Sequence, residues 1–160
     1  MATRILMLAV LLGLAGSIGY FTYVQLRPAG VCEVCHRSIH EATAYEIHLE
    51  DGAAQKACCP RCGLRFQRDR TDVASAEVTD FDTGQRVDAN DAFFVEGSSV
   101  NLCHKKMVEE DRSGVQYQLT WDRCMPSLIA FKDRESAETF RTDYGGVVKT
   151  YEEILEEEKL

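Results

Sequence analysis

The chain has 160 residues, a formal net charge of −8 at pH 7, seven cysteines and only three prolines. An acidic surface disfavours nucleic-acid binding, and the composition argues against long disordered segments. The odd number of cysteines means that intramolecular disulfides cannot account for all of them.

The first 30 residues contain an apolar segment of membrane-spanning length. An uncharged run from Ile5 to Leu26 follows the single charge of Arg4, and about 20 apolar residues suffice to cross a bilayer. We therefore expect residues 1–30 to form a signal anchor, a single transmembrane helix in the cytoplasmic (inner) membrane, with the soluble domain facing the periplasm or the outside. A cleaved signal peptide is the alternative, because the sequence around Ser17 resembles a processing site.

Residues 31–160 are long enough for one compact domain. We expect an α+β fold of two ββα-type halves, about 31–90 and 91–160. In the first half, Ala44 to Leu49 alternate as a strand, Asp51-Gly52 indicates a hairpin turn, and Gln55 to Cys58 form the returning strand. Pro60 then begins a short helix.

The second half follows a similar pattern. Val115 to Trp121 alternate, Ser127 to Phe131 form an apolar strand, and Asp133 caps a helix that ends at Gly145-Gly146. Thr150 with Glu153 forms a capping box for a last, acidic helix. The aromatic residues expected in the core are Tyr45, Phe93, Phe94, Trp121, Phe131 and Phe140.

Five cysteines lie in two clusters, Cys32-Glu-Val-Cys35-His36 and Cys58-Cys59-Pro-Arg-Cys62. A Cys-x-x-Cys turn and a second pair at a helix start allow four sulfurs to converge tetrahedrally on a metal. The helix N-terminus is expected to lower the pKa of Cys62 and favour its thiolate. Cys32, Cys35, Cys58 and Cys62 are the first-choice metal ligands, with Cys59 as a spare thiol.

Two known families resemble these residues. The run "CEVCH…DG…CCPRC" resembles the TRASH type of heavy-metal module. The second half resembles NosL, the copper-handling accessory protein of nitrous oxide reductase, in Asp91-Ala-Phe-Phe-Val-Glu-Gly97, Leu128-Ile-Ala-Phe131, Ser136-Ala137, Phe140 and Gly145-Gly-Val-Val148. The resemblance spans roughly residues 31 to 155.

The resemblance implies a membrane-attached, periplasm-facing protein of paired ββα-type units that binds Cu(I). Such a protein passes copper to a partner, either a recipient copper protein or a copper transporter, and has no catalytic chemistry of its own. NosL proteins are typically lipoproteins, whereas Ser17 stands here where the lipidated cysteine would be. Their copper-binding methionine is matched by Cys124, with Met125 beside it, and both are soft ligands that suit Cu(I). Cys124 and Met125 are therefore candidates for a second or transfer site.

Other interpretations of the same residues stay open. Cys32, Cys35 and His36 complete a C-x-x-C-H sequence, the attachment pattern of haem c, with His40, His48, His104, Met107 and Met125 as candidate distal ligands. A structural zinc site or disulfides would use the same cysteines. Cys59 and Cys62 form a C-x-x-C pair that a thiol oxidoreductase would use. For Cys103, loop packing or a disulfide to Cys124 is favoured over a ligand role.

Overall fold

The computed structural model describes residues 13, 16, 17, 19, 30–103, 108–118 and 121–158. Nearly all of the expected signal anchor at residues 1–30 lies outside these ranges, as do His104 and Met107. Within the described ranges, no helix combines the length and the apolar character needed to cross a membrane. The α+β fold is built from the described residues from 30 onward.

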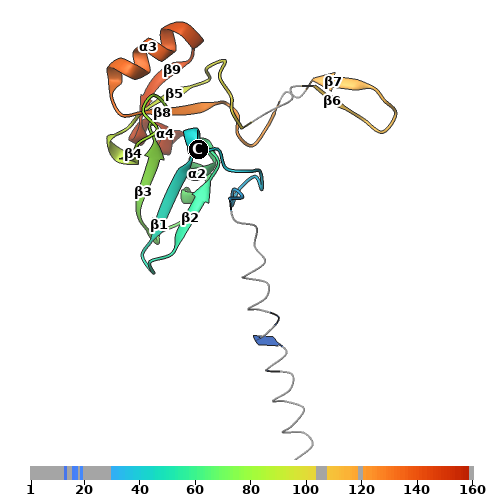
Figure 1. Ribbon diagram of the computed structural model, residues 1–160, viewed down its shortest axis with the longest axis vertical. Helices are drawn as coiled ribbons and strands as arrows, with labels where there is room; N and C mark the ends of the chain where they lie inside the picture. The colour runs from blue at the N-terminus through green and yellow to red at the C-terminus, as the bar shows by residue number, and fades with distance from the viewer. Residues whose placement is uncertain are drawn as a thin grey trace, which may run out of the picture.

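Residues 45–88 build a four-stranded antiparallel sheet with the strand order β2-β1-β3-β4 (Figure 1). The turn between its first two strands is the predicted one, because Gly52 adopts a φ of 85° and donates its N–H to the Leu49 carbonyl at 2.9 Å. The strands are β1 (Tyr45–Leu49), β2 (Ala54–Ala57), β3 (Val73–Thr79) and β4 (Arg86–Asp88).

Helix α2 (Pro60–Gln67) connects β2 to β3 and packs on β1. Pro60 stands at its first position, where the missing N–H costs nothing. Gly63 allows a very close approach, because a Cβ there would lie 2.2 Å from Cδ1 of the buried Tyr45 ring. The Tyr45 hydroxyl donates a 2.5 Å hydrogen bond to Gln67 of the same helix. The ring therefore fixes the spacing between the helix and the sheet.

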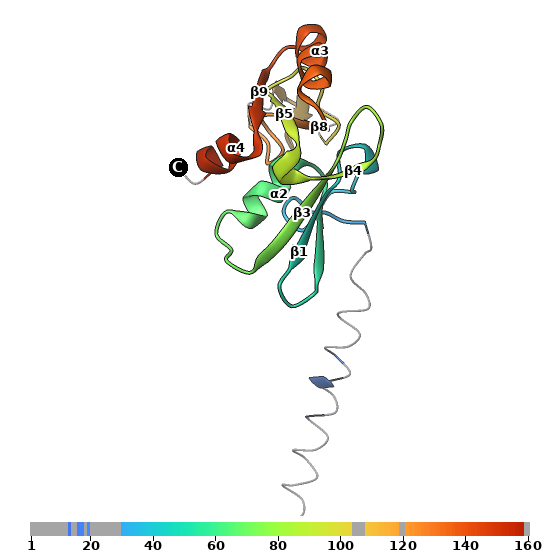
Figure 2. The same ribbon diagram turned by 90° about the vertical axis from the view of Figure 1, so that its left-hand side faces the viewer.

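The second sheet has the strand order β8-β5-β9 and is covered by α3 (Figures 1 and 2). Both predicted caps are present: Asp133 accepts the N–H of Ser136 at 2.8 Å, and Glu153 accepts the N–H of Thr150 at 2.7 Å. The elements are β5 (Phe93–Glu96), β8 (Leu128–Phe131), α3 (Arg134–Tyr144), β9 (Val147–Thr150) and α4 (Tyr151–Glu158), with short 3-10 helices η1 (Glu41–Thr43) and η2 (Ala89–Asp91) before β1 and β5.

The structure thus confirms, for the described residues, an α+β fold with two sheets, one of four strands and one of three; the division into two similar halves stays a prediction. In the second half, the partner of strand β8 differs from the one that the sequence pattern predicted. Strand β8 pairs with β5, whereas the alternating segment after Val115 forms β7 (Gln116–Gln118) and pairs with β6 (Val108–Glu110). This separate hairpin extends away from both sheets (Figure 1).

The hydrophobic core lies between the two sheets and continues beneath α3. Tyr45, Ile47 and Leu64 of the first half meet Phe94 and Leu128 of the second half in one cluster. Alternate residues of β5 and β8 face the other way and pack with Phe140 of α3 in a smaller cluster. The expected core aromatics are buried except for Phe93, which is half-buried, and Trp121. The latter prediction was wrong: Trp121 is 65 % exposed, because it lies outside both sheets.

Candidate metal centre

All seven cysteines are free thiols, and their sulfurs gather into two groups of four. Within each group every sulfur lies within 4.8 Å of the others. The first thiol group consists of Cys32, Cys35, Cys58 and Cys62, and the second thiol group consists of Cys58, Cys59, Cys103 and Cys124. Cys58 belongs to both.

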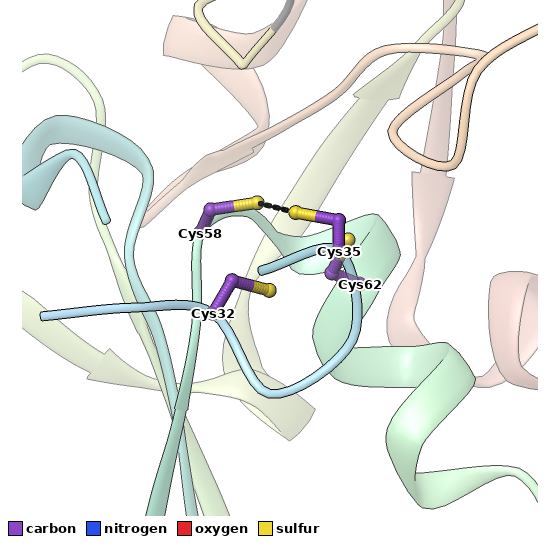
Figure 3. Close-up of side chains that lie close together, drawn as sticks. All are labelled: Cys32, Cys35, Cys58 and Cys62. Carbon is purple, nitrogen blue, oxygen red and sulfur yellow. Dashed lines mark hydrogen bonds between the residues drawn. The ribbon is translucent and has the colours of Figure 1, made fainter. Parts of the chain in front are cut away.

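The first thiol group begins with a tight turn from Cys32 to His36. The N–H of His36 donates to the Cys32 carbonyl at 3.0 Å, and the N–H of Val34 donates to the Cys32 sulfur at 3.4 Å. His36 closes the turn with a φ of 57°, in the left-handed region. The turn directs both cysteines toward Cys58 and Cys62 (Figure 3). An N–H bond to a sulfur favours its thiolate form.

The second pair of this group comes from the start of α2. Cys58 follows β2, Cys59 is the N-cap residue, and Cys62 lies in the first turn of the helix. The close packing of Gly63 on Tyr45 holds that turn against the sheet. The hairpin and the helix therefore position Cys58 and Cys62 without help from a metal ion.

The second thiol group joins the two halves of the chain. Cys103 donates its S–H to the carbonyl of Cys58 at 3.5 Å. The sulfur of Cys124 lies 3.7 Å from that of Cys58 and 3.6 Å from that of Cys62. Cys124 therefore contacts both groups, although it lies more than 60 positions away from either partner.

An arginine–aspartate pair holds the Cys124 loop against the Cys32 turn. Arg37 donates to both carboxylate oxygens of Asp122, to the Cys103 carbonyl at 3.3 Å, and to the Cys124 sulfur at 3.7 Å. Asp122 in turn accepts the N–H of Cys124 at 2.8 Å. The guanidinium lowers the pKa of Asp122, and the carboxylate raises the pKa of Arg37. This pair places a fixed positive charge beside the Cys124 sulfur.

Two arginines of α2 hold the same loop from the other side. Arg61, which is 3 % exposed, donates to the Pro126 carbonyl at 3.1 Å and forms ion pairs with Glu96 and Glu158. Arg65 donates to the carbonyls of Arg123 and Met125. The loop that carries Cys124 is thus attached to the helix that carries Cys62.

The spacing of the sulfurs matches metal ligation and differs from that of disulfides. The close contacts of Cys58 measure 3.4 Å to Cys35, 3.8 Å to Cys59 and 3.7 Å to Cys124. A disulfide would bring two sulfurs to about 2.05 Å. A tetrahedral metal with bonds of about 2.3 Å places its sulfurs about 3.8 Å apart. The disulfide between Cys103 and Cys124, one of the two interpretations favoured for Cys103, is not formed, because both are free thiols.

At this spacing the seven thiols cannot all ionise unless a cation joins them. Two thiolates 3.7 Å apart repel each other by about 4.5 kcal/mol at an effective dielectric constant of about 20. Some thiols therefore keep their protons and donate to neighbouring thiolates. Hydrogen bonding lowers the pKa of Cys32, chiefly through Cys58, and that of Cys124, chiefly through Cys103.

The pKa values of the other cysteines follow the same division. Bonding to Cys103 lowers the pKa of Cys59 to about 5, whereas burial raises the pKa of Cys35 to about 11. Interaction with Cys124 raises the pKa of both Cys62 and Cys103. The expectation that the helix N-terminus lowers the pKa of Cys62 was therefore wrong, because the adjacent Cys124 thiolate has the larger effect. Bound cations would replace the shared protons.

The structure brings together one cysteine more than the predicted set of metal ligands. Cys59, expected as a spare thiol, lies in the second thiol group, and so does Cys103, for which loop packing or a disulfide to Cys124 was favoured. Met125 is half-buried beside Cys124, and its role as a ligand stays a prediction. His36 is exposed on a left-handed turn.

Access to the thiols is uneven. Cys35 is half-buried, whereas the other six cysteines are buried. A cavity of about 10 Å³ adjoins Cys59, Cys103 and Cys124, which is about the space of one water molecule. An open cleft of about 650 Å³ borders the turn at Val34 and is lined by Trp121 and Arg123. An ion exchanging with a partner would therefore pass by Cys35.

Comparison with known proteins places this site in a known fold. No protein-family model matches the chain. The chain is 25 % identical over 129 residues to the HTH-type transcriptional repressor CutR of Bacillus subtilis (strain 168), which covers 79 % of this chain but only 57 % of the repressor. The chain thus spans little more than half of that relative.

A solved structure shares the architecture. The crystal structure of the copper chaperone NosL from Shewanella denitrificans superposes with a TM-score of 0.57 at 20 % identity, covering 78 % of this chain and 89 % of NosL. The predicted α+β fold agrees with this match. The chain therefore has a NosL-like fold, with a cysteine cluster suited to a metal at the junction of its two halves.

Proposed function

We propose that this protein is a Cu(I) metallochaperone, anchored in the membrane by its N-terminal segment, that delivers copper to a partner metalloprotein outside the cytosol. The observation that carries the proposal is the convergence of all seven thiols on the junction between the halves. The shared fold with a copper chaperone, a binding protein rather than an enzyme, supports it. We accordingly assign no catalytic residues.

Copper(I) is the metal that best fits these donors. Thiolate sulfur is a soft ligand that selects Cu(I) among the metals available to a cell, and zinc is the other metal held by four thiolates. A structural zinc site is closed on all sides. Here Cys35 is half-buried and its neighbour Val34 lines an open cleft, so a partner's sulfur or imidazole can reach an ion held by the first thiol group.

Transfer would proceed by ligand exchange at this edge. A donor atom of the partner binds the ion next to Cys35, and the sulfurs of the first thiol group are then displaced one at a time. Arg37 and Asp122 keep the remaining ligands in place during the exchange, because they bind the backbone at Cys103 and Cys124. The partner approaches over the face that carries Val34, Trp121 and Arg123.

The expected location gives the free thiols a reason to hold metal. Outside the cytosol, adjacent thiols oxidise to disulfides unless they are coordinated. Seven free thiols with sulfurs as close as 3.4 Å would be protected there by bound Cu(I). The location itself is tested by fusing a reporter enzyme that is active only in the periplasm to the C-terminus.

The geometry disfavours the haem alternative. Attachment of haem c would direct the thiols of Cys32 and Cys35 to a porphyrin, whereas both point toward Cys58 and Cys62 (Figure 3). Cys32 is fully buried, and His36 is turned outward by its left-handed backbone. A thiol oxidoreductase is also disfavoured, because Cys59 is 4 % exposed and out of a substrate's reach.

The test is metal competition with the full 160-residue chain, purified without oxygen. We expect it to retain Cu(I) against a chromogenic Cu(I) chelator and to show no haem absorption. Replacing a ligand by Cys35→Ser should weaken retention more than about 100-fold, the upper end of what losing a partner of a ligand costs. The exposed Ser38→Ala is the matched control and should change nothing. Loss of all copper to the chelator by the unmodified chain, or a covalently held haem, would refute the proposal.

A further inference from the structure

We propose that the chain binds two soft metal ions at once, in a dinuclear cluster in which the sulfur of Cys58 bridges the ions. The identity of the metal as Cu(I) rests on the proposed function, whereas the number of ions and the bridge rest on geometry alone. One ion lies in the first thiol group and the other in the second.

The number of cysteines agrees with a shared ligand. Two four-coordinate sites with separate ligands need eight thiols, and two sites that share one ligand need seven. The chain has seven cysteines, and the two groups use every one of them with Cys58 in common. The odd count, which disulfide pairing could not explain, is the count that a singly bridged pair requires.

The position of Cys58 suits a bridging sulfur. It lies 3.4 Å from Cys35 on the side of the first thiol group, and 3.8 and 3.7 Å from Cys59 and Cys124 on the side of the second. All three distances are close to the edge of about 3.8 Å in a tetrahedral thiolate site. Two tetrahedra that share this corner place their ions about 3.7 Å apart.

The surroundings offset part of the charge that such a cluster carries. Sharing one thiolate reduces the number of negative ligands per ion. Arg37 adds a guanidinium N–H to the sulfur of Cys124 at 3.7 Å, and this arginine is held by Asp122 rather than free to leave. Without such partners, buried thiolates of like charge would be strongly disfavoured.

The two sites differ in how readily they exchange. The first thiol group includes the half-buried Cys35, whereas all members of the second are buried. Cys124 lies 3.6 Å from Cys62, so the ligands of the two sites touch at a second place as well as at Cys58. The first site therefore exchanges with partners, and the second retains its ion and holds the two halves of the chain together.

The test is nuclear magnetic resonance of the full chain loaded with 113Cd(II), a soft ion that reports each thiolate site separately. We expect two cadmium resonances coupled through the shared sulfur. The coupling should vanish in Cys58→Ser. Cys103→Ser should lose the second-group resonance alone, and Cys35→Ser should lose the first-group resonance alone. The exposed Ser99→Ala is the control and should keep both resonances.

A parallel Cu(I) titration should give two equivalents for the unmodified chain and one for Cys103→Ser. A single cadmium resonance, or two without coupling, would overturn the bridged pair, and the competition with the Cu(I) chelator could still succeed. Conversely, two coupled resonances in a chain that yields its Cu(I) to the chelator would uphold the cluster and refute the copper function. If Cys103→Ser fails to fold by circular dichroism, Cys59→Ser tests the same group.

Discussion

Replacing Gly63 by alanine gives a sharp test of how the helix that carries Cys62 is positioned. The added Cβ would lie 2.2 Å from Cδ1 and 2.4 Å from Cγ of the Tyr45 ring. Carbon atoms normally approach to about 3.5 Å, so the helix and the ring must separate by about 1.3 Å. The ring is fully buried and its hydroxyl is bonded to Gln67 at 2.5 Å. The helix therefore has to move, and Cys62 moves with it.

Overpacking of this kind costs about 1 to 3 kcal/mol. In an unconstrained helix the same change would stabilise the fold by up to about 1 kcal/mol, because alanine is the better helix former. Overpacking and helix propensity therefore predict opposite signs for the change in the free energy of unfolding. We expect a lower midpoint in urea unfolding and weaker Cu(I) retention, since metal bonds tolerate displacements of only about 0.2 Å.

The matched control for Gly63→Ala is Gly52→Ala. Gly52 has φ of 85° but no atom within 4 Å of its added Cβ. This variant should be less stable only because alanine disfavours the positive φ at this position, and its copper retention should be unchanged. A Gly63→Ala protein as stable as the parent, with unaltered copper retention, would refute the proposed packing constraint.

Three further predictions concern charge and metal. Arg61→Met leaves Glu96 without one of its cationic partners and should lower the free energy of unfolding by about 3 to 5 kcal/mol. The control, Arg68→Ala at an exposed position, should alter it by less than about 0.5 kcal/mol. Equal effects of the two changes in urea titrations would contradict the buried ion-pair network. Because Arg37 lowers the pKa of Asp122, their interaction stabilises the fold above the unfolded pKa of about 3.9, and this stabilisation is lost as the pH falls through the lower folded pKa. Thermal midpoints should therefore fall less steeply with acid in Asp122→Asn than in the parent, and parallel curves would show that the pair contributes nothing. Removing bound metal with a chelator should lower stability by about 4 kcal/mol if free metal had exceeded its dissociation constant about 1,000-fold, so identical melting curves before and after removal would argue against ligation in the folded state.

The local structure around α2 could be predicted from sequence because its determinants are adjacent residues. Asp51-Gly52 fixes the hairpin turn, Pro60 starts the helix, and Asp133 caps the later one. These effects depend on backbone conformations within a few positions. The grouping of the four cysteines of the first thiol group could be predicted for the same reason, since they lie in two short motifs joined by one hairpin.

The second thiol group depends on tertiary contacts that no short pattern encodes. Cys103 contacts Cys58 across 45 positions of sequence. Cys124 precedes β8, which pairs with β5, whereas the alternating segment after Val115 suggested a nearer partner for that strand. That segment is a surface hairpin, so alternation indicated a strand but not its burial, and Trp121 was wrongly expected in the core. The total of seven cysteines is the one feature of the sequence that agrees with the shared ligand proposed above.

The hairpin of β6 and β7 lies in the sequence between Cys103 and Cys124, both of which belong to the second thiol group. A metal ion bound there as proposed would close a loop of about 20 residues and fix the two ends of the segment that carries the hairpin. Its turn at Asp111 is stabilised by its own bonds, from the N–H groups of Ser113 and Val115. A fluorescent group attached at this turn would therefore tumble more slowly when the loop is closed. Its tumbling rate would report whether metal occupies the second thiol group, which is itself buried.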